Sequence, residues 1–214
     1  MIHLGLWAAA GREEPGVQNV HKLLATAGVL GLIVFSGPAM ADASQSMPMC
    51  TGCHGADGAS GITPDTPIIA GLDVAVFEDA MFAYLDGGRK CAPSGAMMCQ
   101  ITTSLSEDDI VELAAHFAAM PYKPAGEAFD AALAATGEEI HENNCAMCHG
   151  VHEPGDPQFS IVHGQKIAYL SNVIQQYAAG ERDQLPPMQT AISALTPEET
   201  EALLNYYASY RASD

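Results

Sequence analysis

Basic residues are scarce in this chain. Its 214 residues include 8 Lys and Arg against 26 Asp and Glu, which gives a formal net charge of −18. A surface this acidic repels phosphate backbones and anionic lipids, and so argues against a nucleic-acid-binding or membrane-surface protein. It is compatible with electrostatic steering toward a basic partner, and equally with a salt-rich habitat.

Long apolar runs are missing as well. The longest, 23–35, falls short of the roughly 20 residues that a membrane-spanning helix needs. It follows Lys22 and precedes Ala39-Met40-Ala41, a pattern typical of a secretory signal peptide, here predicted over 1–41. A retained N-terminal anchor is the alternative, and a translation start further down the chain is open. The mature chain is expected in the periplasm, without a membrane span.

No stretch alternates apolar and polar residues like a half-buried strand, so an all-α fold is expected. The six cysteines of an exported chain would first suggest disulfides. Four of them, however, stand in two Cys-x-x-Cys-His runs, which is the attachment motif of c-type haem. A thioredoxin-like pair lacks βαβ surroundings here, and a zinc site would leave the methionines unexplained. We therefore predict two covalently bound haem c groups, with attachment and proximal iron ligation by Cys50, Cys53, His54, Cys145, Cys148 and His149.

The two remaining cysteines, Cys91 and Cys99, are eight positions apart. In an oxidising compartment, the expectation is a structural disulfide that closes a short loop. A cysteine ligand to iron is the alternative.

The chain repeats itself. The haem motifs begin 95 positions apart (Cys50 and Cys145), the Gly-x-Arg segments 87–89 and 180–182 are offset by 93, and Leu105 and Leu195 by 90. After each leucine comes a helix start with a capping-box pattern, Ser106 to Asp109 and Thr196 to Glu199. Each half is expected to contain a helix that leads into the haem motif, a middle helix, a ligand loop and a closing helix. The middle helices are predicted over 74–85 and 167–178, and the lead-in helix is clear only in the second half, from about 128 to 143.

An internal duplication therefore organises the mature chain. We predict domain 1 over 42–120, a linker over 121–126 that contains Pro121, Pro124 and Gly126, and domain 2 over 127–214. Each domain is small, so the haem is expected to supply much of the apolar surface around which it folds.

The offset of 90 positions between Leu105 and Leu195 also selects the distal iron ligands among the ten methionines. Met98 and Met188 each lie seven residues before the leucine that precedes a capped helix, and both are therefore predicted as ligands. Met97 would align with Pro187, so it is expected to be a packing neighbour. Four histidines are the rivals, but none occupies the matched position, so they are interpreted as surface or structural residues: His116, His141, His152 and His163.

A neutral thioether favours the ferrous state, and a haem with both axial positions filled leaves no place for oxygen or substrate. The pattern thus predicts electron transfer and argues against a di-haem peroxidase, which needs an open distal side. Apolar residues expected to wall the haems are Ile69, Leu72, Phe77, Ile101, Ile161, Leu170 and Ile192.

The half-domain pattern of haem motif, Gly-x-Arg segment, ligand methionine and Leu-Ser/Thr helix start resembles the class I cytochromes of the di-haem cytochrome c4 type. The linker 122–125, the segment 129–137 and His141 are similar to those in the cytochrome subunit of flavocytochrome c sulfide dehydrogenase. This resemblance implies two tandem class I cytochrome c domains, and an electron-transfer subunit that is not itself catalytic.

The implied partner is a separate FAD-bearing flavoprotein that oxidises sulfide, so FAD is expected only in that subunit. Electrons would pass on to a small soluble acceptor such as a cytochrome c. A free-standing carrier to a terminal oxidase is the alternative. The cysteine pair beside the first ligand loop departs from the family pattern: bridged, it would restrain Met98, and reduced, it would put the first distal ligand in doubt.

Overall fold

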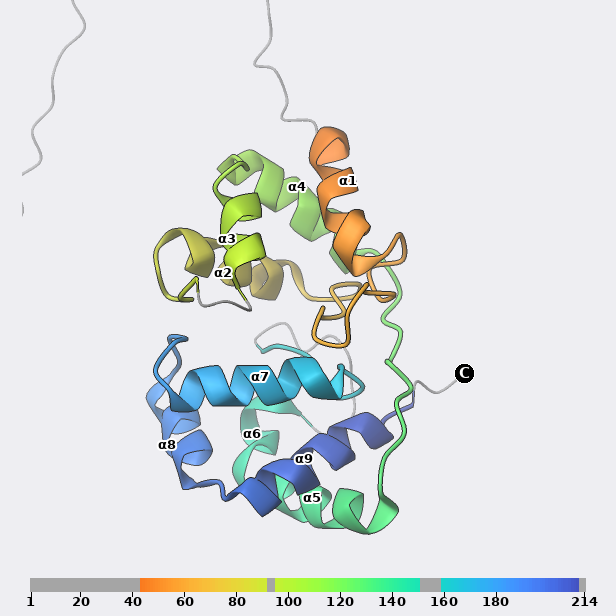
Figure 1. Cartoon of the computed structure of the whole chain (residues 1–214), viewed down its shortest axis with the longest axis vertical. Helices are drawn as coiled ribbons and strands as arrows, with labels where there is room; N and C mark the ends of the chain where they lie inside the picture. The colour runs from red at the N-terminus through yellow and green to blue at the C-terminus, as the bar shows by residue number, and fades with distance from the viewer. Residues whose placement is uncertain (1–42, 92–94, 151–158, 212–214) are drawn as a thin grey trace, which may run out of the picture. The chain divides into compact units, whose positions relative to one another are not determined.

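Helices account for the regular structure in the computed structural model, which describes residues 43–91, 95–150 and 159–211 (Figure 1). The predicted signal peptide and His152 lie outside the described residues. All described residues belong to one contact unit, Met40–Asp214. No strand is present in these ranges, which confirms the all-α prediction. No helix within them combines the length and apolar character that crossing a membrane requires.

The helices follow one order twice along the chain. The first half contains α1 (Ala43–His54), α2 (Val74–Leu85), α3 (Ala96–Thr102) and α4 (Glu107–Ala118). The second half contains α5 (Ala131–Asn144), α6 (Ala146–His149), α7 (Ile167–Ala178), α8 (Pro186–Ala194) and α9 (Pro197–Ser209). A lead-in helix with a haem motif at its end, a middle helix, a short methionine-bearing helix and a closing helix thus recur in both halves.

The middle helices α2 and α7 have the predicted bounds. The first half has the expected lead-in helix α1, although its amphipathic pattern is blurred by the haem motif and by Pro48 inside the helix. One other feature differs from the prediction. The methionine-bearing segments, expected as loops, contain the short helices α3 and α8.

Both predicted capping boxes are present. The Ser106 hydroxyl accepts a hydrogen bond from the Asp109 amide, and the Asp109 carboxylate accepts one from the Ser106 amide. Thr196 and Glu199 make the same pair at the start of α9. Each cap stabilises its helix by about 1 kcal/mol, and so the two closing helices start where the sequence predicts.

Each half has its own apolar core. In the first, the rings of Phe77 (α2) and Phe117 (α4) stack with their centroids 5.7 Å apart. In the second, α5 packs closely against α9 (Figure 1). Gly137 of α5 makes this approach possible, because a Cβ atom there would lie 2.1 Å from the carbonyl oxygen of Ala202. The closing helix of each half thereby supports the elements that carry the haem motif.

The two halves are joined along a seam, which we define as residues 88–90 with 181–183, together with Ile68 and Gln165. Arg89 and Arg182 form an isolated antiparallel bridge. The Gln165 side chain accepts from the Ile68 amide and donates to the Ile68 carbonyl, both at 2.9 Å. Tyr122 of the predicted linker donates to the His163 carbonyl at 2.6 Å. The seam is therefore held by directional polar contacts rather than by an apolar interface alone.

Candidate haem-binding sites

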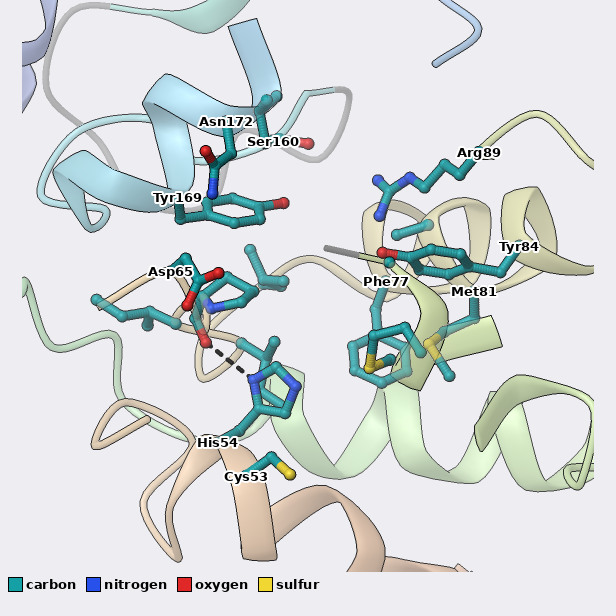
Figure 2. Close-up of a pocket in the computed structure, with 18 of the residues that line it drawn as sticks. Cys53, His54, Asp65, Phe77, Met81, Tyr84, Arg89, Ser160, Tyr169 and Asn172 are labelled. Carbon is teal, nitrogen blue, oxygen red and sulfur yellow. Dashed lines mark hydrogen bonds between the residues drawn. The ribbon is translucent and has the colours of Figure 1, made fainter. Parts of the chain in front are cut away.

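One pocket gathers the whole set of residues predicted for the first haem, namely Cys50, Cys53, His54 and Met98. Figure 2 shows Cys53 and His54 on one side of this pocket, with Phe77 and Met81 nearby. Tyr169 and Asn172, from α7 of the second half, face it from across the seam. Residues far apart in the chain thus enclose one space around a predicted iron ligand.

Five of the apolar residues expected to wall the haems line this same pocket: Ile69, Leu72, Phe77, Ile101 and Ile161. Leu170 belongs instead to the second apolar core, and Ile192 is half-buried on α8. A flat apolar group would find a largely apolar lining here, interrupted by a few polar side chains.

His54 is oriented by its own backbone surroundings. Its Nδ1 lies 2.9 Å from the Pro67 carbonyl oxygen, which can only accept, so Nδ1 carries the proton and Nε2 keeps its lone pair. Burial lowers the pKa of His54, which favours the neutral ring. A neutral imidazole with its other nitrogen held by a carbonyl is the usual arrangement of a metal-ligating histidine.

His149 repeats this geometry in the second half. Its Nδ1 lies 3.3 Å from the Ser160 carbonyl oxygen. Ser160 follows Pro67 by 93 positions, the offset of the Gly-x-Arg segments. The duplication therefore preserves the backbone acceptor that orients each predicted proximal ligand, although the sequence itself does not single it out.

The four cysteines of the motifs are free thiols, and Cys50 is buried whereas the other three are half-buried. Burial raises the pKa of Cys50, and burial likewise raises that of Cys145, so both thiols are protonated at neutral pH.

The methionine of the first half points inward from a short helix. Met98 on α3 is half-buried and packs against the first core, and its carbonyl accepts from the Thr102 hydroxyl at 2.9 Å. Met97, expected as a packing neighbour, is 59% exposed at the rim of the same pocket. Met98 is therefore the methionine of α3 that packs inward against the first core, although both methionines line the pocket.

The second predicted set is distributed over the end of α5, α6 and α8. Cys145, Cys148 and His149 lie at the end of α5 and in α6, and Met188 is half-buried on α8. The pocket of Figure 2 contains none of these four residues. Residues 151–158, which follow the second haem motif, lie outside the described part of the chain.

Cationic side chains collect at the pocket, which the sequence did not reveal. Arg89, Lys90 and Arg182 all line it, in a chain with only 8 basic residues. Burial opposes ionisation of Tyr169, yet the charges of Arg182 and Arg89 lower the pKa of this phenol. One feature of the sequence could have revealed this cluster: Arg89 and Arg182 occupy matched positions of the repeat in a chain with few basic residues.

Arg182 is buried, with 7% of its surface exposed. Its guanidinium lies over the rings of Tyr169 and Tyr177, and its Nε donates to Gln176 at 2.6 Å. Within the described ranges, no carboxylate is at ion-pair distance from it. A buried cation is stable only when it is paired, so the pocket fits an apolar group that carries its own carboxylates. Haem, with two propionates, has this chemistry.

Another polar cluster supports the second motif. His141 is fully buried; its Nε2 lies 2.8 Å from the Gly150 carbonyl oxygen and its Nδ1 3.1 Å from the Tyr207 hydroxyl. Because a carbonyl oxygen only accepts, Nε2 donates and Nδ1 accepts from Tyr207 in the neutral ring. His141 thus ties α5 and α9 to the residue after His149, consistent with a structural histidine.

Comparison with known proteins shows that this chain is similar to c-type cytochromes. Residues 134–210 match the family model Cytochrome c. Cytochrome c-554(548) of Halomonas halodenitrificans is 37% identical over 68 residues, which make up 32% of this chain and 80% of that protein.

Longer matches extend over both halves. Cytochrome c4 of Pseudomonas aeruginosa is 28% identical over 198 residues, or 86% of this chain and 94% of that protein. The thiosulfate dehydrogenase electron acceptor of Stutzerimonas stutzeri is 28% identical and covers 78% and 81%, respectively. The structure of cytochrome c4 from Acidithiobacillus ferrooxidans superimposes with a TM-score of 0.67 at 24% identity, over 75% of this chain and 98% of that one.

Proposed function

The chain belongs to the cytochrome c family, and we propose that it relays electrons in the periplasm through two covalently bound haem c groups. Its helices form two tandem class I cytochrome c domains, and it is similar to the di-haem electron carriers of the cytochrome c4 type. The observation that carries the proposal is the single pocket that brings Cys50, Cys53, His54 and Met98 together.

In this proposal, Cys50 and Cys53 attach the first haem, and Cys145 and Cys148 attach the second. His54 with Met98, and His149 with Met188, would be the iron ligands. When bound, a haem with histidine and methionine ligands supplies one-electron chemistry at a comparatively high potential. With both ligands of each iron supplied by the chain, it would act as a carrier and not as the catalytic subunit. Its domains are proposed to span 42–120 and 127–214, joined by 121–126.

The cations at the seam complete the first site. Arg182 and Arg89, both lining the pocket beside Tyr169, would bind the haem carboxylates. Such pairing would give the buried guanidinium of Arg182 its counter-ion.

For the electron donor, we favour a separate FAD-bearing flavoprotein that oxidises sulfide. The support is the resemblance of residues 122–125 and 129–137 and of His141 to the cytochrome subunit of flavocytochrome c sulfide dehydrogenase. The structure assigns these residues supporting tasks: Tyr122 bonds the second half, Asp130 caps α5, and His141 ties α5 to Gly150. The acceptor would be a small soluble protein such as a cytochrome c.

A second candidate donor is an enzyme that oxidises thiosulfate. It is favoured by the likeness to the thiosulfate dehydrogenase electron acceptor over 78% of this chain. Both candidates are oxidoreductases of reduced sulfur compounds, and they differ in substrate. A free-standing carrier to a terminal oxidase is the third arrangement, in keeping with the likeness to cytochrome c4.

Purification of the protein from its host at native stoichiometry separates these donors. A co-eluting flavoprotein together with sulfide-dependent haem reduction supports the favoured one. Reduction of the haems by thiosulfate, through a co-eluting partner, supports the second. A protein that elutes alone, and that neither compound reduces in the host extract, overturns both and leaves the free-standing carrier.

The ligand assignment has its own test. A methionine–iron bond in ferric haem c gives an absorption band at about 695 nm. Met98→Ala and Met188→Ala should each remove about half of this band, because each abolishes one of two equivalent bonds. Full intensity in both variants would show that other residues are the distal ligands.

A further inference from the structure

The disulfide between Cys91 and Cys99 has a noncovalent counterpart in the other half of the molecule. The sulfur atoms of Cys91 and Cys99 are bonded, with the Cα atoms 6.0 Å apart. The Gly-x-Arg offset of 93 takes Cys91 to Gln184, and the methionine offset of 90 takes Cys99 to Gln189. The Gln184 amide donates to the Gln189 side-chain oxygen. The same two positions are therefore linked in both halves, covalently in one and by a hydrogen bond in the other.

The disulfide joins the methionine-bearing helix to the seam. Cys99 is buried on α3, directly after Met98, whereas Cys91 is exposed and directly follows Lys90. The Lys90 amide donates to the Glu181 carbonyl at 2.9 Å, and the Asp183 amide donates to the Gly88 carbonyl at 2.7 Å. These two bonds flank the bridge between the two arginines of the repeat. One end of the disulfide is thus anchored on the second half of the molecule.

Helix α3 has few restraints of its own. It spans seven residues, and Gly95 at its N-cap offers no side chain to bond the first amides. Helices this short are unstable in isolation. The inward position of Met98 thus depends on contacts from outside the helix, and the disulfide at the adjacent residue is the one covalent tie among the described residues.

The corresponding helix in the second half is built differently. Helix α8 spans nine residues and begins with Pro186 at a position where proline is favoured. Its link to the preceding segment is the Gln184–Gln189 bond, together with a bond from Gln184 to the Tyr177 carbonyl at 3.3 Å. A neutral side-chain hydrogen bond opens far more readily than a disulfide.

We propose that the Cys91–Cys99 disulfide is a positioning element of the first haem site, which holds Met98 on the distal side. Met188 at the second site is held by the weaker glutamine pair. Two sites with the same ligand types then differ in how readily an external ligand displaces the methionine, and the first is the more closed. This inference rests on the proposed ligand roles of Met98 and Met188.

The test uses variants in which one of the two predicted ligand methionines is replaced by histidine, so that only the other haem gives the methionine–iron band. In Met188→His holoprotein, the band at about 695 nm reports only the first haem. Imidazole is titrated into the ferric protein, and loss of the band measures displacement of Met98. Adding Cys91→Ala with Cys99→Ala should raise the imidazole affinity of this haem by roughly tenfold. If the double variant does not mature, Cys91→Ser, at the exposed end of the disulfide, takes its place.

The matched control reads the other haem. In Met98→His holoprotein, removal of the disulfide should leave imidazole binding at the second haem within a factor of about two, because the two sites are independent of this link. In that same background, with the disulfide intact, the second haem should bind imidazole more tightly than the first haem does in Met188→His. Gln184→Ala should raise its affinity further.

Different failures are distinguishable. Equal loosening of both haems on removal of the disulfide would show general destabilisation and overturn the positioning role. An unchanged affinity at the first haem would overturn it as well, while leaving the ligands as proposed. Absence of the band in Met188→His with the disulfide intact would instead overturn Met98 as a ligand, and this inference with it.

Discussion

Replacement of Gly137 by alanine should weaken the second half of the molecule by a predictable amount. An added Cβ would lie 2.1 Å from the Ala202 carbonyl oxygen, 2.5 Å from its carbonyl carbon and 2.8 Å from the Cβ of Tyr206. Ordinary contact begins at 3.4 Å, so the shortfall is 1.3 Å (3.4 − 2.1). The obstacle is the backbone of α9, and relief requires α5 and α9 to move apart.

The size of the effect follows from two opposing contributions. Overpacking against a rigid backbone costs about 3 kcal/mol, at the upper end of the usual range. Alanine is more favourable than glycine inside a helix by about 1 kcal/mol. The net destabilisation is then about 2 kcal/mol, which lowers the Tm of a domain of this size by about 8–16 °C.

Differential scanning calorimetry of the holoprotein measures this change. Thr136→Ala serves as a control, since Thr136 is the preceding residue of α5, is exposed and bonds only the Ala132 carbonyl. The control should unfold within a few degrees of wild type because it adds no bulk at the crossing. A Gly137→Ala protein as stable as wild type, or more stable, would refute the close crossing of α5 and α9.

Three further predictions concern polar groups near the seam and the first haem motif. Arg182→Met removes a positive charge that favours the reduced state. It should lower the potential of the first haem by about 70 mV, for a charge about 10 Å from the iron and an effective dielectric constant of about 20. Redox titration checks this, with Arg211→Met, which removes an exposed cation, as the control. Gln165→Leu leaves the buried amide and carbonyl of Ile68 unpaired and should destabilise the protein by about 3 kcal/mol in urea unfolding; an unchanged midpoint would contradict the role of this contact. Hydrogen bonds from the amides of Ala59 and Ser60 lower the pKa of Asp57 from 3.8 to about 2, so its stabilising effect is complete above about pH 4 and is lost as the pH falls through about 2. Asp57→Asn should therefore reduce the fall of the urea midpoint between about pH 4 and about pH 2. If the midpoint of the variant falls as steeply as that of wild type, the Asp57 carboxylate does not contribute to stability.

Features that depend on near neighbours in the chain were predictable. The capping boxes at Ser106 and Thr196 join residues three positions apart, and the middle helices follow from a period of 3.6 residues. The existence of helix α1 follows from the repeat, but its bounds could not be predicted because Pro48 and the haem motif interrupt its apolar face. Helices α3 and α8 are too short to show a periodic pattern and depend on tertiary contacts for their stability.

The sequence by itself determined the two haem motifs, the duplication and the matched methionines, because each is a spacing along one chain. Tertiary structure alone decided how the halves meet. Gln165 bonds Ile68 across 97 positions, and the two arginines of the repeat converge on Tyr169. The disulfide beside Met98 was predictable from the spacing of its two cysteines, whereas the fold alone decided its attachment to the seam and the bond between the two glutamines next to Met188. Contacts of this kind depend on where folded backbones bring distant side chains, and no local pattern of residues encodes them.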